Sequence, residues 1–380
     1  MPSGTLTVAN KLRDVGYATG AFGKWGIGDA IPEGDPNEKG FDQYNGYVDM
    51  YHAHNFFPPF LVRNGKREVL QNDLIAGSDD GPNSGRGNGV AANPREYAPD
   101  FIRQEAIKFI ESHAHERFFL YLALNMPHAN NEGGKGDFQR GMEVPDYGDF
   151  ANQDWPNPEK GFARMLEHID QTVALLVNRL QELGISQNTL VLFTSDNGPH
   201  QEGGHIVDFF DSNGLLLGRK RDLYEGGIRV PLIAYWPGKI TAASSSAHLS
   251  GFQDWMPTLC ELSGAPLPIR CDGLSLVPTL LGNQADQQKH DFLYFEFYEG
   301  GGKQAIVTEK WKCVRLNWND KPNGPIELYD LEADESEQTN LADAHGEVVQ
   351  QMLARLSIAH TPHQGSTTPP DRGGKANSAR

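Results

Sequence analysis

Short apolar segments that stop abruptly at polar side chains constrain the fold of this chain more than any other feature. The plainest runs from Leu190 to Phe193 and leads into Ser195-Asp196-Asn197-Gly198. Such a run suits a strand buried on both faces of a parallel sheet. Ligands of open α/β sheets gather where strands end, and adjacent Asp and Asn offer two hard oxygen ligands for Ca²⁺ or Mg²⁺. Asp-Asn-Gly is also ordinary turn chemistry, so for the segment taken alone a strand-to-turn junction is the simpler interpretation.

Two further predicted strands end in the same way. Residues 17–22 lead into Gly23-Lys24-Trp25-Gly26, where the two glycines allow a sharp turn that holds Lys24 at a strand end. Residues 118–124 lead into Asn125-Met-Pro-His128. Taken singly, a surface lysine and a structural histidine are the simpler interpretations.

Predicted helices alternate with these strands. Apolar side chains recur at three- and four-residue steps over residues 6–15, 99–113 and 159–183, and residues 232–236 form another apolar strand. This alternation predicts a parallel or mostly parallel sheet sandwiched by helices.

The pattern changes near the C-terminus. Four short strands with close turns are followed by one helix at residues 347–358, which predicts an antiparallel sheet with a packing helix. The strands are 292–298, 304–308, 312–316 and 326–330. We therefore expect an α/β domain at 1–285, an antiparallel α+β subdomain at 286–360 and a disordered tail at 361–380, rich in Pro, Gly, Ser and Lys.

Composition narrows the class of function. A formal net charge of -17 argues against a nucleic-acid partner, although a few local lysines and histidines can still bind an anionic small substrate. Three widely spaced cysteines exclude a disulfide scaffold and a Cys-rich zinc site. No apolar stretch is long enough for a membrane span, and the first residues show no signal peptide. The oligomeric state is not indicated.

Several weak motifs gain weight from their order. They are Gly23-Lys24-Trp25, Gly40-Phe-Asp42, Pro127-His128, Ser195-Asp-Asn-Gly198, Lys220 five residues before Glu225-Gly-Gly, Pro257-Thr-Leu259 and Asp272-Gly-Leu-Ser275. Together, across nearly the whole chain, they resemble the type I sulfatases, and in particular their arylsulfatase-like bacterial branch. The resemblance implies an alkaline-phosphatase-like α/β domain with a small antiparallel C-terminal subdomain.

The resemblance also implies roles for individual residues. Asp196 and Asn197 would ligate a Ca²⁺ ion that touches the sulfate, with Mg²⁺ as the other possibility, and Lys24, His128 and Lys220 would contact sulfate and leaving-group oxygens. Sulfate ester hydrolysis moves negative charge onto those oxygens, so fixed cations lower the barrier, and a histidine can protonate the leaving group. Family members often carry His directly after the Lys-Trp pair, where this chain has Gly26.

The loops at 47–97 and 130–158 would line the substrate entrance in this fold. Candidate substrate-binding residues in them, and in the loop after residue 194, are His52, His54, Asn55, Asn130 and His200. We expect a sulfated small molecule or glycan as the partner, and a periplasmic or extracellular location, because full-length relatives are usually exported.

The family's nucleophile motif is absent from these residues. Sulfatases use a formylglycine made from the Cys or Ser of Cys-x-Pro-Ser-Arg, and none of Cys260, Cys271, Cys313 or Ser3 lies in such a sequence. The paired N-terminal aspartates that complete the metal site are also missing. The opening helix and strand therefore resemble the second α/β unit of an N-terminally truncated sulfatase, and we expect the 380 residues alone to lack appreciable turnover.

Three other interpretations remain open. A phosphate or phosphonate ester hydrolase of the same superfamily would need a richer set of metal ligands. A non-catalytic binder of sulfated glycans would use the same cations without turnover. An inert fragment would do neither.

Overall fold

The computed structural model describes residues 4–27, 34–79, 84–134, 140–319, 321 and 324–361. They fall into two compact units, each described by itself. The first unit comprises Met1–Thr194, His200–Ser212 and Pro231–Lys289, and the second comprises Ser195–Pro199, Asn213–Val230 and His290–Arg380. Ser3 and all but the first residue of the predicted tail lie outside the described residues.

The first unit is built on a five-stranded mixed sheet in the order β4-β3-β2-β1-β5. The strands are β1 (Ala18–Lys24), β2 (Gln43–Tyr47), β3 (Phe60–Arg63), β4 (Lys66–Val69) and β5 (Phe118–Ala123). β1 runs parallel to both β2 and β5, whereas β3 is antiparallel to β2 and β4. β2 was not predicted from the sequence, and β3 and β4 lie within residues 47–97, so the expectation that this whole segment is a loop was wrong.

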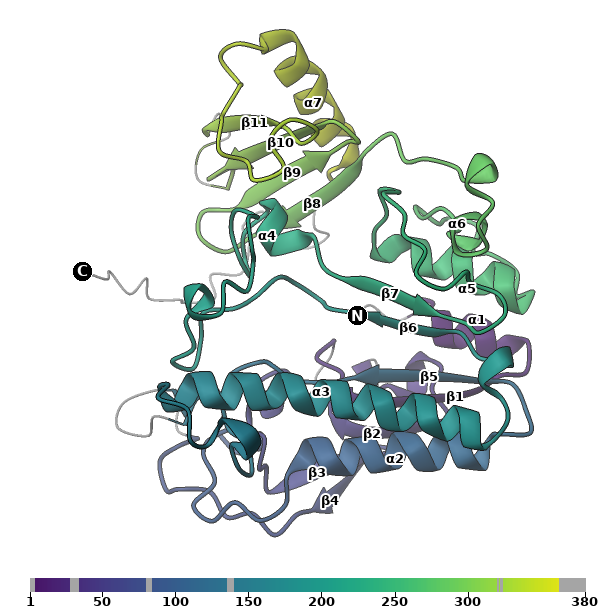
Figure 1. Ribbon diagram of the computed structural model, residues 1–380, viewed down its shortest axis with the longest axis vertical. Coiled ribbons are helices and arrows are strands. Elements are labelled where there is room, and N and C mark those ends of the chain that lie inside the picture. Colours follow the sequence, from purple (N-terminus) through teal and green to yellow (C-terminus); the bar gives the residue numbers. More distant parts are fainter. Residues whose placement is uncertain are drawn as a thin grey trace. The chain divides into compact units, whose positions relative to one another are not determined.

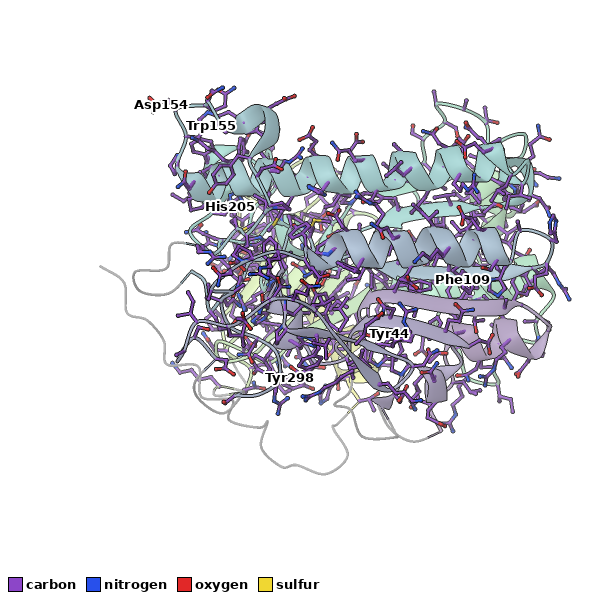
Figure 2. All side chains as sticks on the ribbon, turned by 90° about the horizontal axis from the view of Figure 1, so that it is seen from below. Tyr44, Phe109, Asp154, Trp155, His205 and Tyr298 are labelled. Atoms are coloured by element: carbon purple, nitrogen blue, oxygen red, sulfur yellow. The ribbon has the colours of Figure 1, made fainter. Side chains whose placement is uncertain are left out.

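Helices cover both faces of this sheet, as α/β layering requires. On one face α2 (Ala98–Ser112) packs with α3 (Asn157–Glu182) beside it, and Phe109 of α2 meets Phe22 of β1 with ring centroids 5.6 Å apart (Figures 1 and 2). On the other face α1 (Val8–Asp14) packs against β1 and against α5 (Trp255–Ser263). The helices predicted at 99–113 and 159–183 are confirmed to within two residues.

The strand that ends before Asp196 differs from its prediction. β6 (Val191–Thr194) pairs antiparallel with β7 (Leu232–Tyr235) in a separate two-stranded sheet. All four residues of β6 are only half-buried, and Ile233 of β7 is 60% exposed. A continuous apolar run indicates a strand but does not reveal its pairing partner or how fully it is covered.

The second unit contains a four-stranded antiparallel sheet in the order β11-β10-β9-β8. Its strands are β8 (Leu293–Phe297), β9 (Lys303–Val307), β10 (Trp311–Leu316) and β11 (Ile326–Asp330). Helix α7 (Gly346–Ala359) packs Met352 and Leu356 onto one face of the sheet. Leu223, which precedes α4 (Glu225–Ile228), packs on the other face against Ala305 and Val314. The predicted antiparallel sheet with its packing helix is confirmed.

Shorter elements complete the chain. They are α6 (Val277–Leu280) and the 3-10 helices Asn37–Lys39, His52–His54, Gly148–Phe150, Ser186–Asn188, Val207–Phe209, Phe252–Asp254 and Gln284–Asp286. Across the described residues, every helix is too short or too polar to cross a membrane.

Candidate active site

The Asp196–Asn197 segment is held by close backbone packing in the second unit. The amide of Gly198 donates to the carbonyl oxygen of Gly227 over 2.9 Å. A Cβ on Gly198 would lie 1.8 Å from the carbonyl oxygen of Gly226, so only glycine allows this approach. Asp196 is exposed and Asn197 is half-buried. The segment therefore presents a carboxylate and an amide from a tightly fixed backbone.

Lys220 lies on the neighbouring segment. Its backbone amide donates to the carbonyl oxygen of Pro199 over 2.9 Å, and the amide of Gly226 closes the loop by donating to Leu217 over 2.7 Å. Arg221 next to it has a φ of +78°, the left-handed region that side chains other than glycine seldom adopt. The predicted metal-binding and sulfate-binding motifs of this unit thus share one backbone framework.

The donor types of this segment suit a hard cation, because Asp196 and Asn197 both offer oxygen ligands. Their number is too small for a complete site, since Ca²⁺ takes 6–8 ligands. Among the described residues, moreover, no group of three or more His, Cys, Asp or Glu side chains is arranged to hold a metal ion. The two residues therefore offer part of a ligand set for a hard cation, and a calcium site here stays a prediction.

Lys24 is the last residue of β1, where it pairs with Tyr47 of β2. Gly23 before it has a φ of +108°, and a Cβ there would lie 2.0 Å from the carbonyl oxygen of Ala123 on β5. Trp25 after it is buried and donates from Nε1 to the carbonyl oxygen of Gly34 over 2.7 Å. Lys24 is thus fixed at the carboxyl end of a central parallel strand, as the sequence predicts.

His128 lies among aromatic and acidic side chains of the first unit. Its Nδ1 donates a hydrogen bond to the carbonyl oxygen of Ala129 over 2.8 Å. In the neutral ring Nε2 is therefore the nitrogen without a proton. That nitrogen is 3.9 Å from Oε2 of Glu202. The ring of His54 stacks on His128 with centroids 5.1 Å apart, and Nδ1 of His54 lies 3.2 Å from Oε2 of Glu132. These contacts fix the His128 ring with Nε2 toward Glu202, and a role in proton transfer stays a prediction.

His200 contacts the backbone next to this cluster. Its Nε2 donates to the carbonyl oxygen of Pro127 over 2.7 Å, and its Nδ1 accepts from the amide of Glu202 over 3.1 Å. His205 lies beside the first turn of α3, where its Nδ1 is 2.6 Å from Oε2 of Glu159 (Figure 2). Because both ring nitrogens of His200 bond to backbone, its contacts support a structural role and add nothing to the prediction that it binds substrate.

Three more candidates are buried with their polar atoms engaged. His52 is 2% exposed, its Nε2 lies 2.9 Å from the carbonyl oxygen of Phe60, and burial lowers its pKa to about 4. Asn55 donates to Gly87 over 3.1 Å and accepts from Phe57 over 2.9 Å. The Nδ2 of Asn130 lies 2.7 Å from Glu143, and its Oδ1 accepts from Gly133 over 2.9 Å. These contacts organise loops, and a direct role with substrate stays a prediction.

The sequence analysis missed two carboxylates of the His128 cluster, Glu132 and Glu202. Each lies in a polar, glycine-rich stretch where an acidic residue carries no distinctive signal. Only the fold brings them to histidines 78 and 74 positions away in the chain, respectively. The predicted set divides between the units, with Lys24 and His128 in the first and Asp196, Asn197 and Lys220 in the second.

Comparison with known proteins identifies the family. Residues 2–265 match the family described as Sulfatase. The chain belongs to the sulfatase family. Residues 217–361 also match the family described as N-sulphoglucosamine sulphohydrolase, C-terminal. The resemblance inferred from ordered short motifs is therefore confirmed, as is the fold class that it implied.

Curated sulfatases are similar over most of this chain. Arylsulfatase A of Homo sapiens is 31% identical over 82% of this chain and 59% of its own length. The N-acetylgalactosamine-6-O-sulfatase of Bacteroides thetaiotaomicron is 26% identical over 94% of this chain and 77% of its own length. N-acetylgalactosamine-6-sulfatase of Canis lupus familiaris is 31% identical, and the match covers 53% of it. The chain thus spans little more than half the length of several of these relatives.

Two solved structures share the fold of this chain. One, from work on glycosaminoglycan metabolism by Bacteroides thetaiotaomicron, has a TM-score of 0.71 at 25% identity, covering 94% of this chain and 82% of that one. Another, Ps i-CgsB in complex with k-i-k-neocarrahexaose, has a TM-score of 0.71 at 25% identity, covering 92% of this chain and 73% of that one.

Proposed function

We propose that this chain takes part in hydrolysing the sulfate ester of a sulfated glycan. Family membership supports the reaction class, and the names of two similar proteins support the substrate class. One is an N-acetylgalactosamine-6-O-sulfatase, and the other is described in complex with a neocarrahexaose. We expect an exported protein, periplasmic or extracellular, as in the family. We also propose that the α/β domain ends near residue 285, where the C-terminal subdomain begins.

The observation that carries this proposal is the shared backbone framework of the second unit. The amide of Gly198 bonds to Gly227 and the amide of Lys220 bonds to Pro199, each over 2.9 Å. Two hard oxygen donors and a cation therefore belong to adjoining segments. That combination suits an oxyanion accompanied by a divalent cation, since both positive groups would stabilise charge on sulfate oxygens.

The remaining roles follow from the chemistry of each side chain. Asp196 and Asn197 would hold a Ca²⁺ ion, which supplies a fixed positive charge when bound. Lys24 and Lys220 would contact sulfate oxygens as point charges. His128, with its Nδ1 proton committed to Ala129, would exchange a proton at Nε2 with the leaving-group oxygen.

The proposal includes a limit on the 380 residues by themselves. They contain no Cys-x-Pro-Ser-Arg sequence from which the formylglycine nucleophile could be made. Loss of the nucleophile costs about a millionfold in turnover in the serine protease that serves as the reference case. We therefore expect these residues to bind a sulfated ligand without appreciable turnover.

Calorimetric titration with galactosamine 6-sulfate, in the presence of Ca²⁺, tests this function. We expect saturable binding to the unmodified chain and to Lys239→Ala, an exposed lysine outside the site. Lys220→Ala should weaken binding about tenfold or more, because it removes the positive charge that is proposed to contact the sulfate. Equal binding of unsulfated galactosamine, or of Lys220→Ala and the unmodified chain, would refute the proposal.

A further inference from the structure

A buried ion network of Lys312, Glu225 and Glu337 lies at the end of the Lys220 segment in the second unit. Lys312 of β10 is 0% exposed, and its Nζ lies 3.0 Å from Oε1 of Glu225 and 2.9 Å from Oε1 of Glu337. The backbone amide of Glu225 also donates to Oε2 of Glu337 over 2.6 Å. Lys312 of β10 thus contacts the side chain of Glu225, and Glu337, in the segment after β11, holds its backbone amide at the start of α4.

Such a network is a poor device for stability alone. Desolvating an ion pair costs about as much as its attraction returns, and apolar residues of similar volume often stabilise a protein more. Burial raises the pKa of Glu337 despite its contact with Lys312. Glu337 also has a φ of +55°, in the left-handed region that favours glycine. The cost of this arrangement points to a positional role.

A second anchor reaches the same loop from the neighbouring strand. Nζ of Lys303, on β9, donates to the carbonyl oxygen of Arg221 over 2.9 Å and lies 2.7 Å from Oδ1 of Asp222. Arg221 is the residue with a φ of +78° directly after Lys220. Lys303 therefore contacts the Arg221–Asp222 part of the loop, whereas Lys312 contacts Glu225.

The two anchors connect to Asp196 and Asn197 through glycine backbone. Gly226 and Gly227 follow Glu225 directly, and they form the surface on which Gly198 packs, with the 2.9 Å hydrogen bond from Gly198 to Gly227. Backbone-to-backbone contact leaves no flexible side chain to absorb a displacement. A shift at Glu225 would therefore move the segment that carries Asp196 and Asn197.

We propose that Lys303 and Lys312 are positioning residues, which set the geometry of Lys220, Asp196 and Asn197 from the C-terminal sheet. This inference rests on the proposed function for what is positioned, although the mechanical connection can be tested without it. Neither lysine needs to touch substrate. The C-terminal sheet would then act as the rigid support for three of the five proposed sulfate-binding and metal-binding residues.

Hydrogen–deuterium exchange of the peptides covering 195–200 and 217–227 tests the connection. Lys303→Met removes one anchor from a side chain that is 20% exposed, so folding should survive. The double variant Lys312→Met/Glu337→Gln removes the other anchor. It leaves Glu225 as the only carboxylate of the buried network. The matched control is Lys310→Met, because Lys310 pairs with Asp330 and Glu332 at the surface of the same sheet.

We expect amides in both peptides to exchange about tenfold faster in Lys303→Met and in the double variant. Exchange in α2 should not change, and Lys303→Arg, which keeps the donors, should restore the protection. Titration followed by Tb³⁺ luminescence should show that the same variants bind Tb³⁺ more weakly than the unmodified chain. The thermal midpoint of Lys303→Met should not change. A purely structural role would lower the midpoint without this selectivity.

Unchanged exchange in Lys303→Met would overturn the inference, as would an equal increase in Lys310→Met. If the double variant does not fold, Lys303→Met decides alone. If Asp196→Ala leaves Tb³⁺ binding unaltered, the metal-binding part of the proposed function fails, while the exchange result still decides whether the two lysines position this loop.

Discussion

The backbone amide of Lys220 donates a hydrogen bond of 2.9 Å to the carbonyl oxygen of Pro199. Residues 21 positions apart are thereby fixed side by side, and each belongs to a segment with a proposed role in binding. Gly198 reinforces this contact by packing directly on the Gly226–Gly227 backbone. Disturbing the glycine contact should therefore affect metal and sulfate binding together.

Gly198→Ala is expected to disrupt the site. The added Cβ would lie 1.8 Å from the carbonyl oxygen of Gly226, so the backbone must move, at a cost of about 1–3 kcal/mol. We expect Ca²⁺ to raise the thermal midpoint of the unmodified chain, and this rise should be lost in Gly198→Ala. Gly346→Ala is the control, because no atom lies within 4 Å of its added Cβ. A Ca²⁺ response in Gly198→Ala equal to that of the control would contradict this prediction.

Two buried groups should give opposing pH dependences of stability. Burial raises the pKa of Glu143 to about 7 from its ordinary 4.5, although Asn130 and Arg140 oppose the shift. Between those pH values the folded chain holds a proton that the unfolded chain releases, so the free energy of unfolding falls as pH rises. Burial lowers the pKa of His52 to about 4 from 6.5, so its contribution rises with pH over that interval.

Glu143→Gln should therefore leave the His52 contribution unopposed. Urea unfolding at pH 4.5, 5.5 and 6.5 should show the free energy of unfolding rising more steeply in this variant than in the unmodified chain. We expect a difference of roughly 2 kcal/mol across the interval. The exposed Glu261→Gln serves as the control. Parallel pH profiles for Glu143→Gln and the unmodified chain would show that the Glu143 pKa is not raised.

The 380 residues are expected to release no nitrophenol from a chromogenic aryl sulfate above the buffer rate. The reason is the missing formylglycine sequence, since binding groups alone leave most of the barrier in place. The assay should be repeated with Lys220→Ala. Turnover that disappears in this variant would mean that the chain carries another nucleophile, and the predicted inactivity would be wrong.

Sequence reasoning predicted the elements with strong periodicity. The apolar stripes of α2 and α3 and the closely spaced strands β8 to β11 each carry enough repeats to identify the element type. It missed β2, because Gln43-Tyr-Asn-Gly-Tyr47 has no alternation of apolar and polar residues. It identified β6 as a strand but expected it in a parallel sheet. Its antiparallel pairing with β7 is a tertiary contact that the apolar sequence of the strand does not encode.

The predicted site shows the same division. The strand-end positions of Lys24 and Asp196 were predictable, because each comes at the end of an apolar run, while their roles stay predictions. His52 and Asn130 were not recognisable as buried, since their partners are the carbonyl oxygens of Phe60 and Gly89 and carbonyl groups have no sequence signature. Lys312 was invisible for another reason, because a lysine in a strand ordinarily indicates a solvent-facing position.

A double-mutant cycle on Asp196 and Lys220 tests the central claim most directly. Binding of galactosamine 6-sulfate in the presence of Ca²⁺ is measured for the unmodified chain, Asp196→Ala, Lys220→Ala and the double variant. Because both residues are proposed to act on one sulfate, the double variant should lose little more affinity than the weaker single variant, a coupling of about 1 kcal/mol or more. Losses that simply add would show two independent residues and contradict the account.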